Sequence, residues 1–325
     1  MVMANDKELL KSVLSLWEFN DDLNIIEENI EYETERKPHI WTVNKDYILK
    51  MTNTESEMKN NIHLINMLSK GNIPSQRIVP SLDGKEYICV ENRFYALFTK
   101  IKGTVLKDYF EGDYLNRGFY LGKCISNLHN ALQNITENLN EGTSLWNNNM
   151  IDELNGWVSY EIDKYIPSCT LAKEDIELFN TIYAEVKNNF ENLYSKLPRQ
   201  AIHRDMHGEN VIFKDAEIVG YIDFDLSQIN ARIYDICYLC TGSLSTIFND
   251  VYKRDIWIGF AENVIKGYDS ISTLTDEERH SMKYMFYLIE LIMIAYFAQN
   301  NYSDIADTNI KMINWISLVW DDCEV

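Results

Sequence analysis

The sequence predicts an α+β protein with a small, β-rich N-terminal lobe and a larger, mainly helical C-terminal lobe. The chain has 325 residues, enough for two domains or for one domain with two lobes at roughly 150 residues per domain. Short β-rich runs recur between Val43 and about Phe98, whereas beyond Gly103 the apolar residues follow a helical period. With 46% apolar and 25% charged residues, the composition is that of an ordinary globular protein.

The first lobe combines strands with one helix. Apolar residues at helical spacing predict a helix from about Glu55 to Ser69, which Gly71 and Pro74 end. Asp83-Gly84 is a turn signal. The β-rich runs that predict strands are Tyr47–Met51, Tyr87–Val90 and Phe94–Phe98.

The second lobe reads as helices with two short β-rich insertions. The insertions are Val211–Phe213 and Ile218–Asp223, and they flank the segment that carries most of the chemistry. Helical periodicity covers 114–132, 151–165, 175–197, 250–268 and 276–299.

The charge balance is strongly acidic. Thirty basic and fifty acidic residues give a net charge of −20, which repels phosphate backbones and anionic lipid. We therefore expect neither nucleic acid nor a membrane as a partner. A solvated acidic surface explains this charge, and attraction of a cationic substrate is the alternative. The sequence gives no indication of oligomeric state.

Three further patterns have simple interpretations. The first residues show no signal-peptide pattern, which predicts a cytoplasmic protein. The longest apolar stretch, Met285–Ala298, contains Glu290 and is shorter than the roughly 20 residues that span a bilayer, so a buried helix is expected. Cys237 and Cys240 have the spacing of a metal or redox pair, but with no second pair and no nearby His we expect core thiols.

The segment around residues 201–225 carries a recognisable set of polar groups. A loop places Asp205 and Asn210 five positions apart, and a predicted hairpin then ends at Asp223. Phosphoryl transfer from ATP requires placement and charge neutralisation more than covalent help. An Asp must accept the hydrogen bond of the attacking hydroxyl, while an Asn and a carboxylate hold Mg²⁺ through oxygen atoms. Asp205, Asn210 and Asp223 supply these three groups, in this order along the chain.

The pattern H-x-D-x-x-x-x-N followed by I-D-F-D resembles the aminoglycoside phosphotransferase and choline kinase-like superfamily. The resemblance extends to Gly122 and His129 in a helix pattern similar to L-G-x-x-L-x-x-L-H. These are ATP- and Mg²⁺-dependent small-molecule kinases with a bilobal, protein-kinase-like fold. The resemblance implies a nucleotide-binding lobe at 1–98, a hinge at 99–103 and a catalytic and substrate-binding helical lobe at 104–325, with ATP and Mg²⁺ between the lobes.

The resemblance also implies roles for other residues. Lys50 corresponds to the strand lysine that contacts ATP phosphates, and Thr99 and Ile101 to hinge residues whose backbone bonds adenine. Asp235 corresponds to a residue that orders the catalytic loop. The helix glutamate that pairs with the lysine is expected at the position of Asn61.

Glu57, one turn before Asn61 on the same helix face, is therefore our candidate partner for Lys50. Only eleven residues separate Asp223 from Asp235 and no Ala-Pro-Glu motif follows, so there is no room for an activation loop and a protein substrate is not expected.

The phosphate acceptor stays open at this stage. An aminoglycoside or another amino-bearing alcohol fits the acidity, and homoserine, choline, a methylthio-sugar or a spore-associated metabolite are alternatives within the same superfamily. Trp157, Tyr160 and Glu161 are candidate substrate residues, although a core stripe at helical spacing explains them nearly as well.

Two functions from other classes remain. His203, Asp205, His207 and Asp223 are residue types that bind zinc or manganese in a metal-dependent hydrolase. The chain would alternatively be a catalytically inactive nucleotide-binding protein. ATP-dependent turnover separates a kinase from both.

Overall fold

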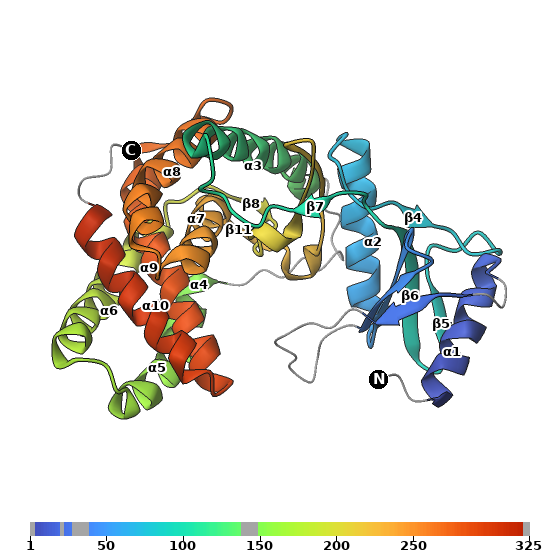
Figure 1. Cartoon of the computed structure of the whole chain (residues 1–325), viewed down its shortest axis with the longest axis horizontal. Helices are drawn as coiled ribbons and strands as arrows, with labels where there is room; N and C mark the ends of the chain where they lie inside the picture. The colour runs from blue at the N-terminus through green and yellow to red at the C-terminus, as the bar shows by residue number, and fades with distance from the viewer. Residues whose placement is uncertain (1–3, 20–22, 28–38, 138–148, 321–325) are drawn as a thin grey trace. The chain divides into compact units, whose positions relative to one another are not determined.

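The computed structural model describes residues 4–19, 23–27, 39–137 and 149–320 (Figure 1). They form two compact units. Unit 1 holds the described residues up to Val105 together with the later segment Val211–Asp225, and unit 2 holds the others. The lobe limits expected at residues 98 and 104 stay a prediction. The predicted α+β class is confirmed, with a β-rich unit 1 and a mainly helical unit 2.

Unit 1 is built around an antiparallel sheet with strand order β1-β2-β3-β6-β4, and β5 also pairs with β6. The predicted strands near 47–51, 87–90 and 94–98 are all present. The strands are β1 (Ile25–Glu27), β2 (His39–Val43), β3 (Tyr47–Thr52), β4 (Ile78–Val79), β5 (Ile88–Val90) and β6 (Arg93–Thr99).

One face of this sheet is covered by a helix that the sequence analysis did not predict, α1 (Ala4–Leu14), followed by the short helix η1 (Ser15–Trp17). Leu14 and Trp17 pack in one buried cluster with Leu49 of β3 and Leu97 of β6. Leu49 and Leu97 are opposite each other in the strand register. Side chains alternate along strands, so the residues next to Leu49 face the other way.

The other face is covered by α2 (Glu55–Lys70), close to the predicted limits. The side chain of Thr54 caps its first turn by accepting the backbone N–H of Glu57, and Gly71 ends it. Met58 and Ile62 pack with Ala96 and Phe98 of β6 in a second cluster. Figure 1 shows α1 and α2 on opposite sides of the sheet.

A second, three-stranded sheet completes unit 1. Its order is β10-β9-β7, with β7 (Thr104–Val105), β9 (Val211–Lys214) and β10 (Glu217–Tyr221) all antiparallel. The two predicted β-rich insertions are therefore a hairpin. Tyr221, at its end, donates its N–H to the carbonyl of Pro74 at 3.0 Å. The hairpin thus belongs to the β-rich unit although it follows most of the helical segments in sequence.

Unit 2 is mainly helical. Most of its helices agree with the predicted helical segments, whereas α7 and α10 were not predicted. A short antiparallel pair joins β8 (Arg199–Ile202) to β11 (Gln228–Ala231), and the loop that carries Asp205 and Asn210 begins directly after β8. The helices are α3 (Tyr114–Glu137), α4 (Met150–Glu153), the π-helical turn η2 (Leu154–Val158), α5 (Ser159–Tyr165), η3 (Ile166–Ser168), α6 (Lys173–Tyr194), α7 (Ile233–Ile247), α8 (Val251–Asp269), α9 (Asp276–Gln299) and α10 (Ser303–Val319).

Helices α3 and α8 approach each other closely at two glycines. A Cβ atom on Gly122 of α3 would lie 1.9 Å from the carbonyl oxygen of Val264, and one on Gly267 of α8 would lie 2.0 Å from that of Phe119. Both distances are far below any tolerable contact, so each position requires glycine. This accounts for Gly122 in the sequence motif by packing.

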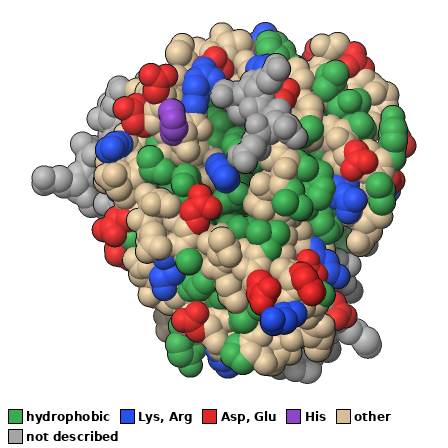
Figure 2. Space-filling view, turned by 90° about the vertical axis from the view of Figure 1, so that its left-hand side faces the viewer, with side chains coloured by type: hydrophobic (Ala, Val, Ile, Leu, Met, Phe, Trp, Pro, Cys, Tyr) green, Lys and Arg blue, Asp and Glu red, His purple; other side chains and the backbone are tan. Residues whose placement is uncertain are grey.

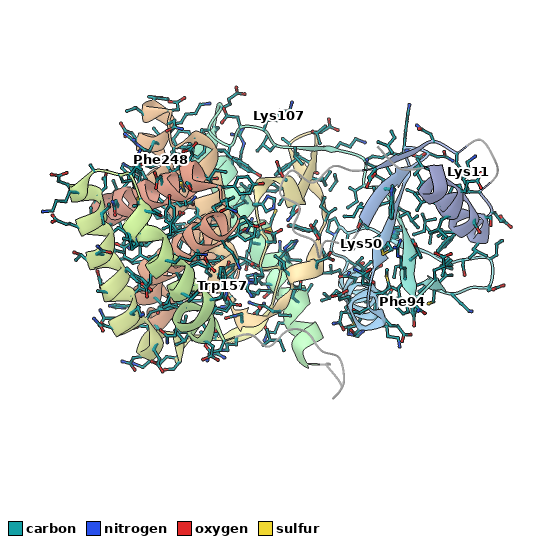
Figure 3. All side chains as sticks on the ribbon, turned by 90° about the horizontal axis from the view of Figure 1, so that it is seen from below. Lys11, Lys50, Phe94, Lys107, Trp157 and Phe248 are labelled. Carbon is teal, nitrogen blue, oxygen red and sulfur yellow. The ribbon has the colours of Figure 1, made fainter. Side chains whose placement is uncertain are left out.

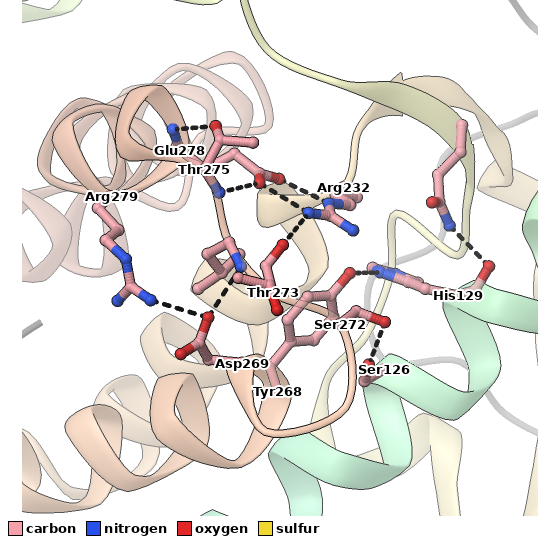
Figure 4. A network of polar contacts seen from close by, with 12 residues as sticks. Ser126, His129, Arg232, Tyr268, Asp269, Ser272, Thr273, Thr275, Glu278 and Arg279 are labelled. Carbon is pink, nitrogen blue, oxygen red and sulfur yellow. Dashed lines mark hydrogen bonds and ion pairs between the residues drawn. The ribbon is translucent and has the colours of Figure 1, made fainter.

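Helix α9 contains the longest apolar stretch of the chain. By length and composition it is the one helix among the described residues that passes as a membrane-crossing candidate, yet 67% of its apolar window is buried inside the structure. Its first turn is fixed by a capping box between Thr275 and Glu278, and Glu278 also pairs with Arg232 at 2.7 Å (Figure 4). The expected buried helix is confirmed.

Surface and thiols fit the sequence expectations. On the face of unit 2 that Figure 2 shows, acidic and basic side chains are interspersed with apolar ones. Cys237 and Cys240 of α7 are free and buried, and burial raises the pKa of the Cys237 thiol well above its ordinary value. They are core thiols as predicted. Cys323 lies outside the described residues.

Candidate functional site

The loop that follows β8 is held by one buried carboxylate. Asp235, at the start of α7, accepts the backbone N–H groups of His203 and Arg204, each at 2.8 Å. Arg204 has a φ of +67°, a strained conformation for a bulky side chain that persists only where the surroundings impose it. The two hydrogen bonds supply that constraint, so the support role expected of Asp235 has a direct structural basis.

Asp235 is itself fixed by a chain of buried hydrogen bonds. Its carboxylate lies 2.9 Å from Nε2 of His129, and Nδ1 of His129 lies 2.9 Å from the hydroxyl of Tyr268. Figure 4 shows the His129–Tyr268 contact within a wider polar network of unit 2. The motif histidine thus orients the carboxylate that shapes the loop. His203 is completely buried, and its Nδ1 accepts the backbone N–H of Asp205 at 3.3 Å.

Asp205 presents a carboxylate surrounded by donors. Its Oδ1 accepts the hydroxyl of Tyr238 at 3.0 Å, and its Oδ2 accepts Nδ2 of Asn210 at 2.9 Å with His207 Nε2 at 3.4 Å. Burial opposes ionisation, but the hydrogen bond and charge of His207, aided by His203 and Tyr238, outweigh it and lower the pKa of Asp205 to about 2. The carboxylate is therefore ionised at neutral pH and able to accept a hydrogen bond.

Asn210 is oriented so that its amide oxygen remains available. Its Nδ2 donates to both the carbonyl and the carboxylate of Asp205, at 2.8 and 2.9 Å. Its Oδ1 accepts no hydrogen bond from any residue that the structure describes. An amide oxygen is a suitable ligand for a hard cation, so this residue fits the metal role predicted for it.

Arg204 connects the loop to helix α4, which the sequence analysis did not foresee. Its guanidinium lies 2.6 Å from the carboxylate of Glu153 and 2.6 Å from Oε1 of Gln228, and it stacks 5.9 Å from the ring of Tyr234. The partners are 51 and 24 residues away in sequence. The loop is thereby tied to the segment α4-η2-α5.

Unit 1 carries the other predicted polar groups. Lys50 of β3 is 9% exposed, and it lies on the α2 side of the sheet because it alternates with Leu49 (Figure 3). It forms an ion pair with Asp225. Burial lowers the pKa of Lys50, but the charges of Asp225 and Asp223 more than offset this and raise it, so the lysine stays protonated.

A pocket in unit 1 gathers these charges. Lys50, Asn61, Asp223 and Asp225 line it together with apolar and aromatic side chains. Asp223 follows β10, is exposed and has a φ of +61°, a conformation that Asp tolerates better than most residues. The pocket therefore combines one cation with two carboxylates.

Thr99 and Ile101, the two residues predicted to bond adenine, differ in the backbone groups that remain available for a ligand. Thr99 donates its N–H to the carbonyl of Arg77 at 2.8 Å, and its hydroxyl accepts the N–H of Arg77 at 3.0 Å. Within the described part of the chain, the backbone N–H and carbonyl of Ile101 make no hydrogen bond, while its side chain packs against Gly220. Ile101 therefore retains both groups for a ligand, whereas the N–H of Thr99 is already used.

Glu57 does not contact Lys50. It lies exposed in the first turn of α2, although its charge still contributes to raising the pKa of Lys50 after those of Asp225 and Asp223. Asn61, one turn later, is buried and reaches the pocket. The pairing of Glu57 with Lys50 stays a prediction, and the ion pair in the structure is made by Asp225.

The candidate substrate residues lie at an irregular part of unit 2. Trp157 is 37% exposed and Tyr160 65% exposed, so a core stripe is the wrong explanation for both, while Glu161 is buried at 7%. Trp157 belongs to the π-helical turn η2, where Gly156 leaves the helical conformation (φ −93°, ψ −112°). Such turns occur often at functional sites. Two aromatic rings, those of Trp157 in η2 and Tyr160 in α5, are therefore exposed three positions apart in the sequence.

The metal-hydrolase alternative gains no support from the structure. Within 4–19, 23–27, 39–137 and 149–320, no three His, Cys, Asp or Glu side chains gather in a way that could hold a metal ion. His203 is engaged with the backbone of its own loop, and His207 lies beside Asp205 and Asn210. These contacts order the loop that follows β8.

A loop aspartate held in this way, on this α+β fold, defines a phosphotransferase of the protein-kinase-like class. The chain belongs to the phosphotransferase enzyme family (APH), which it matches over residues 33–283. This family is the one that the sequence motifs resemble.

Curated relatives of the chain include several homoserine kinases. The chain is 25% identical over 217 residues to the homoserine kinase of Zymomonas mobilis, covering 66% of this chain and 61% of that protein. It is 29% identical over 112 residues to that of Gluconobacter oxydans, covering 33% and 34%. In both cases the match spans less than two thirds of the relative's length.

Solved structures with the same fold include several small-molecule kinases or members of kinase families. The amicoumacin kinase hAmiN, in complex with AMP-PNP, Ca²⁺ and Ami, has a TM-score of 0.68 at 16% identity, covering 95% of this chain and 93% of that one. The GDP and kanamycin complex of APH(2")-IIia has a TM-score of 0.68 at 12% identity, covering 96% and 98%. A choline/ethanolamine kinase family protein from Mesorhizobium loti has a TM-score of 0.62 at 13% identity, covering 97% and 95%. At these identities the likeness establishes the fold, which is protein-kinase-like as predicted.

Proposed function

We propose that this protein transfers the γ-phosphate of ATP to a hydroxyl group of a small molecule, with Mg²⁺ as the metal ion. The observation that carries the proposal is the ionised carboxylate of Asp205, with the amide of Asn210 fixed beside it. Asp205 accepts the hydrogen bond and then the proton of the acceptor hydroxyl, and so orients that oxygen for in-line attack.

Other residues hold the nucleotide and the metal. Oδ1 of Asn210 and the carboxylate of Asp223 would bind Mg²⁺, which supplies charge neutralisation for the phosphates when it is bound. Lys50 holds the α- and β-phosphates. The carbonyl of Thr99 and the backbone groups of Ile101 bond adenine. Glu57 contributes to the nucleotide site only through its negative charge, which helps to raise the pKa of Lys50.

We propose an amino-bearing alcohol as the acceptor, and homoserine as the first compound to test. The names of the curated relatives support homoserine, and the net charge of −20 favours a cationic group. Trp157, Tyr160 and Glu161 form the proposed acceptor region, because two exposed rings beside a buried carboxylate suit an ammonium group. An aminoglycoside and choline are the next candidates. The use of ATP places the proposed reaction in the cytoplasm.

The test is an ATP-consumption assay with Mg²⁺ on homoserine, kanamycin, choline, ethanolamine and methylthioribose, with the Asp205→Ala protein as the blank. Turnover on one compound, absent in the blank, would establish both the chemistry and the acceptor. A parallel run with GTP gives the nucleotide preference. If no nucleotide stabilises the protein against thermal unfolding, the kinase proposal is wrong.

A further inference from the structure

The carboxylate that pairs with Lys50 comes from the motif that follows β10. Asp225 lies in the single-turn helix Phe224–Leu226, two residues after the proposed metal ligand Asp223. Its carboxylate contacts Nζ of Lys50 directly, and the two side chains are 24% and 11% exposed. The pair is sheltered, so its attraction is screened less than that of a surface pair.

Helix α2, where a glutamate partner was expected, supplies no carboxylate in contact with Lys50. The position that faces the lysine is Asn61, 7% exposed, which lines the same pocket as Lys50 and Asp225. The Asn61 side chain makes no hydrogen bond with any other described residue. An amide is neutral, so it cannot balance the charge of a buried lysine.

The charges at positions 61 and 225 have to be considered together, because both side chains line the pocket of Lys50. Asp225 contacts Lys50 and Asp223 lines the same pocket, so the pocket already carries one more negative than positive charge. A glutamate at position 61 would add a third carboxylate where the anionic phosphates must bind, and like charges at such distances repel strongly. With a neutral residue at 61 and a carboxylate at 225, one carboxylate is in direct contact with the lysine and no third one is added to the pocket.

We propose that Asp225 is the positioning residue for Lys50, and that it takes the place of a helix glutamate, with Asn61 as its neutral complement. The proposal deepens the kinase function above and rests on it. Asp225 holds the ammonium group of Lys50 at the pocket, so that the group meets the nucleotide phosphates without first having to be ordered.

A double-mutant cycle tests whether the carboxylate that pairs with Lys50 can be moved from position 225 to position 61. Asp225→Asn should lower kcat/KM for ATP by about tenfold or more, because a sheltered lysine loses its partner. Asn61→Glu in the otherwise unchanged protein should also lower kcat/KM, through the added negative charge. The double variant Asp225→Asn/Asn61→Glu should recover to within about threefold of wild type, a non-additive result typical of two residues that share one partner.

A matched control is Glu55→Gln, which removes the exposed Glu55–Lys59 pair on the same helix and should leave kcat/KM unchanged. If the double variant is no more active than Asp225→Asn, the proposal is overturned. The same holds if Asp225→Asn mainly raises the Mg²⁺ concentration needed for half-maximal rate, which would make Asp225 a metal ligand. If the wild-type protein itself neither binds ATP nor turns over any acceptor, the kinase function fails instead.

Discussion

The imidazole of His129 lies 2.9 Å from the carboxylate of Asp235, in a position where both side chains are buried. The pair joins helix α3 to the start of α7 across 106 residues of sequence. Since Asp235 also accepts two N–H groups of the loop that follows β8, the stability of unit 2 and the shape of this loop depend on the same carboxylate.

Asp235→Asn should therefore lower both stability and turnover. The amide keeps one accepting oxygen but places an NH₂ group against a donor, so we expect a loss of about 2 to 3 kcal/mol in the free energy of unfolding. The strained Arg204 then relaxes and kcat falls. Urea unfolding and steady-state assays measure both. Asp304→Asn, at an exposed site on α10, is the control, and equal losses in the two variants would contradict the role of Asp235.

Asp205→Ala should remove catalysis and leave nucleotide binding intact. A positioned general base contributes about 10² to 10⁴ in rate, so kcat should fall by that factor, while stabilisation by an ATP analogue in a thermal-shift assay stays near the wild-type value. Asp215→Asn, in the exposed turn between β9 and β10, should change neither quantity. Near-normal turnover by Asp205→Ala would refute the assignment.

The low pKa of Asp205 predicts a defined acid dependence. Since its pKa in the folded protein, about 2, lies below the ordinary 3.8, the carboxylate stabilises the fold above about pH 4, and this contribution is lost as the pH falls toward 2. It amounts to about 2 kcal/mol. His207→Gln should raise the pKa of Asp205, because His207 is the main group that lowers it. Titration of the carboxyl group by NMR gives the value, and an unchanged pKa in His207→Gln would contradict the cause named here.

The ion pair between Arg204 and Glu153 should contribute more than a surface pair. Both side chains are largely buried, at 14% and 11% exposure, so Glu153→Gln leaves an uncompensated guanidinium and should cost about 3 kcal/mol of unfolding free energy. Glu177→Gln breaks the exposed pair with Lys173 and should cost less than about 1 kcal/mol. Chemical denaturation of the two variants measures both losses. Similar losses would show that the Arg204–Glu153 pair contributes no more to stability than a surface pair does.

Gly122→Ala should be severely destabilising. The added methyl group would lie 1.9 Å from a backbone oxygen of α8 and 2.7 Å from a backbone nitrogen, and backbone cannot move aside as a flexible side chain can. We expect a loss of about 3 kcal/mol or more. Asn127→Ala, on the exposed face of the same helix, should be neutral or slightly stabilising. A normal melting temperature for Gly122→Ala would show that α3 and α8 do not pack this closely.

Much of the fold could be predicted because local patterns determine it. The strands around Lys50 and Phe98 and the helix from Glu55 are local features with clear periodicity and end signals. Helix α1 was not predicted, because residues 1–35 are rich in acidic residues and were interpreted by their charge rather than by their helical period. Helix α7 was missed because its apolar residues lie all around it, which leaves no periodic stripe.

The candidate site was predictable as far as its motif extends along the chain. Asp205, Asn210, Asp223 and Asp235 follow one another within about 30 residues. The partners of Lys50 and Arg204 were not foreseen, since Asp225 is 175 residues from Lys50 and Glu153 is 51 from Arg204. Pairings of this kind depend on tertiary structure and leave no spacing signal. The exposure of Trp157 could not be predicted either, because the irregular backbone at Gly156 interrupts the regular helical stripe.

The hairpin β9-β10 has a consequence for how the chain folds as it is made. Unit 1 needs this hairpin, yet about a hundred residues, nearly all of them in unit 2, are synthesised between Val105 and Val211. The first 105 residues therefore leave the ribosome as an incomplete domain, and they must wait, with the edge of β7 unpaired, until residue 225 emerges. Synthesis rate and chaperone access over this interval should affect the yield of active protein more than they would for two domains encoded one after the other.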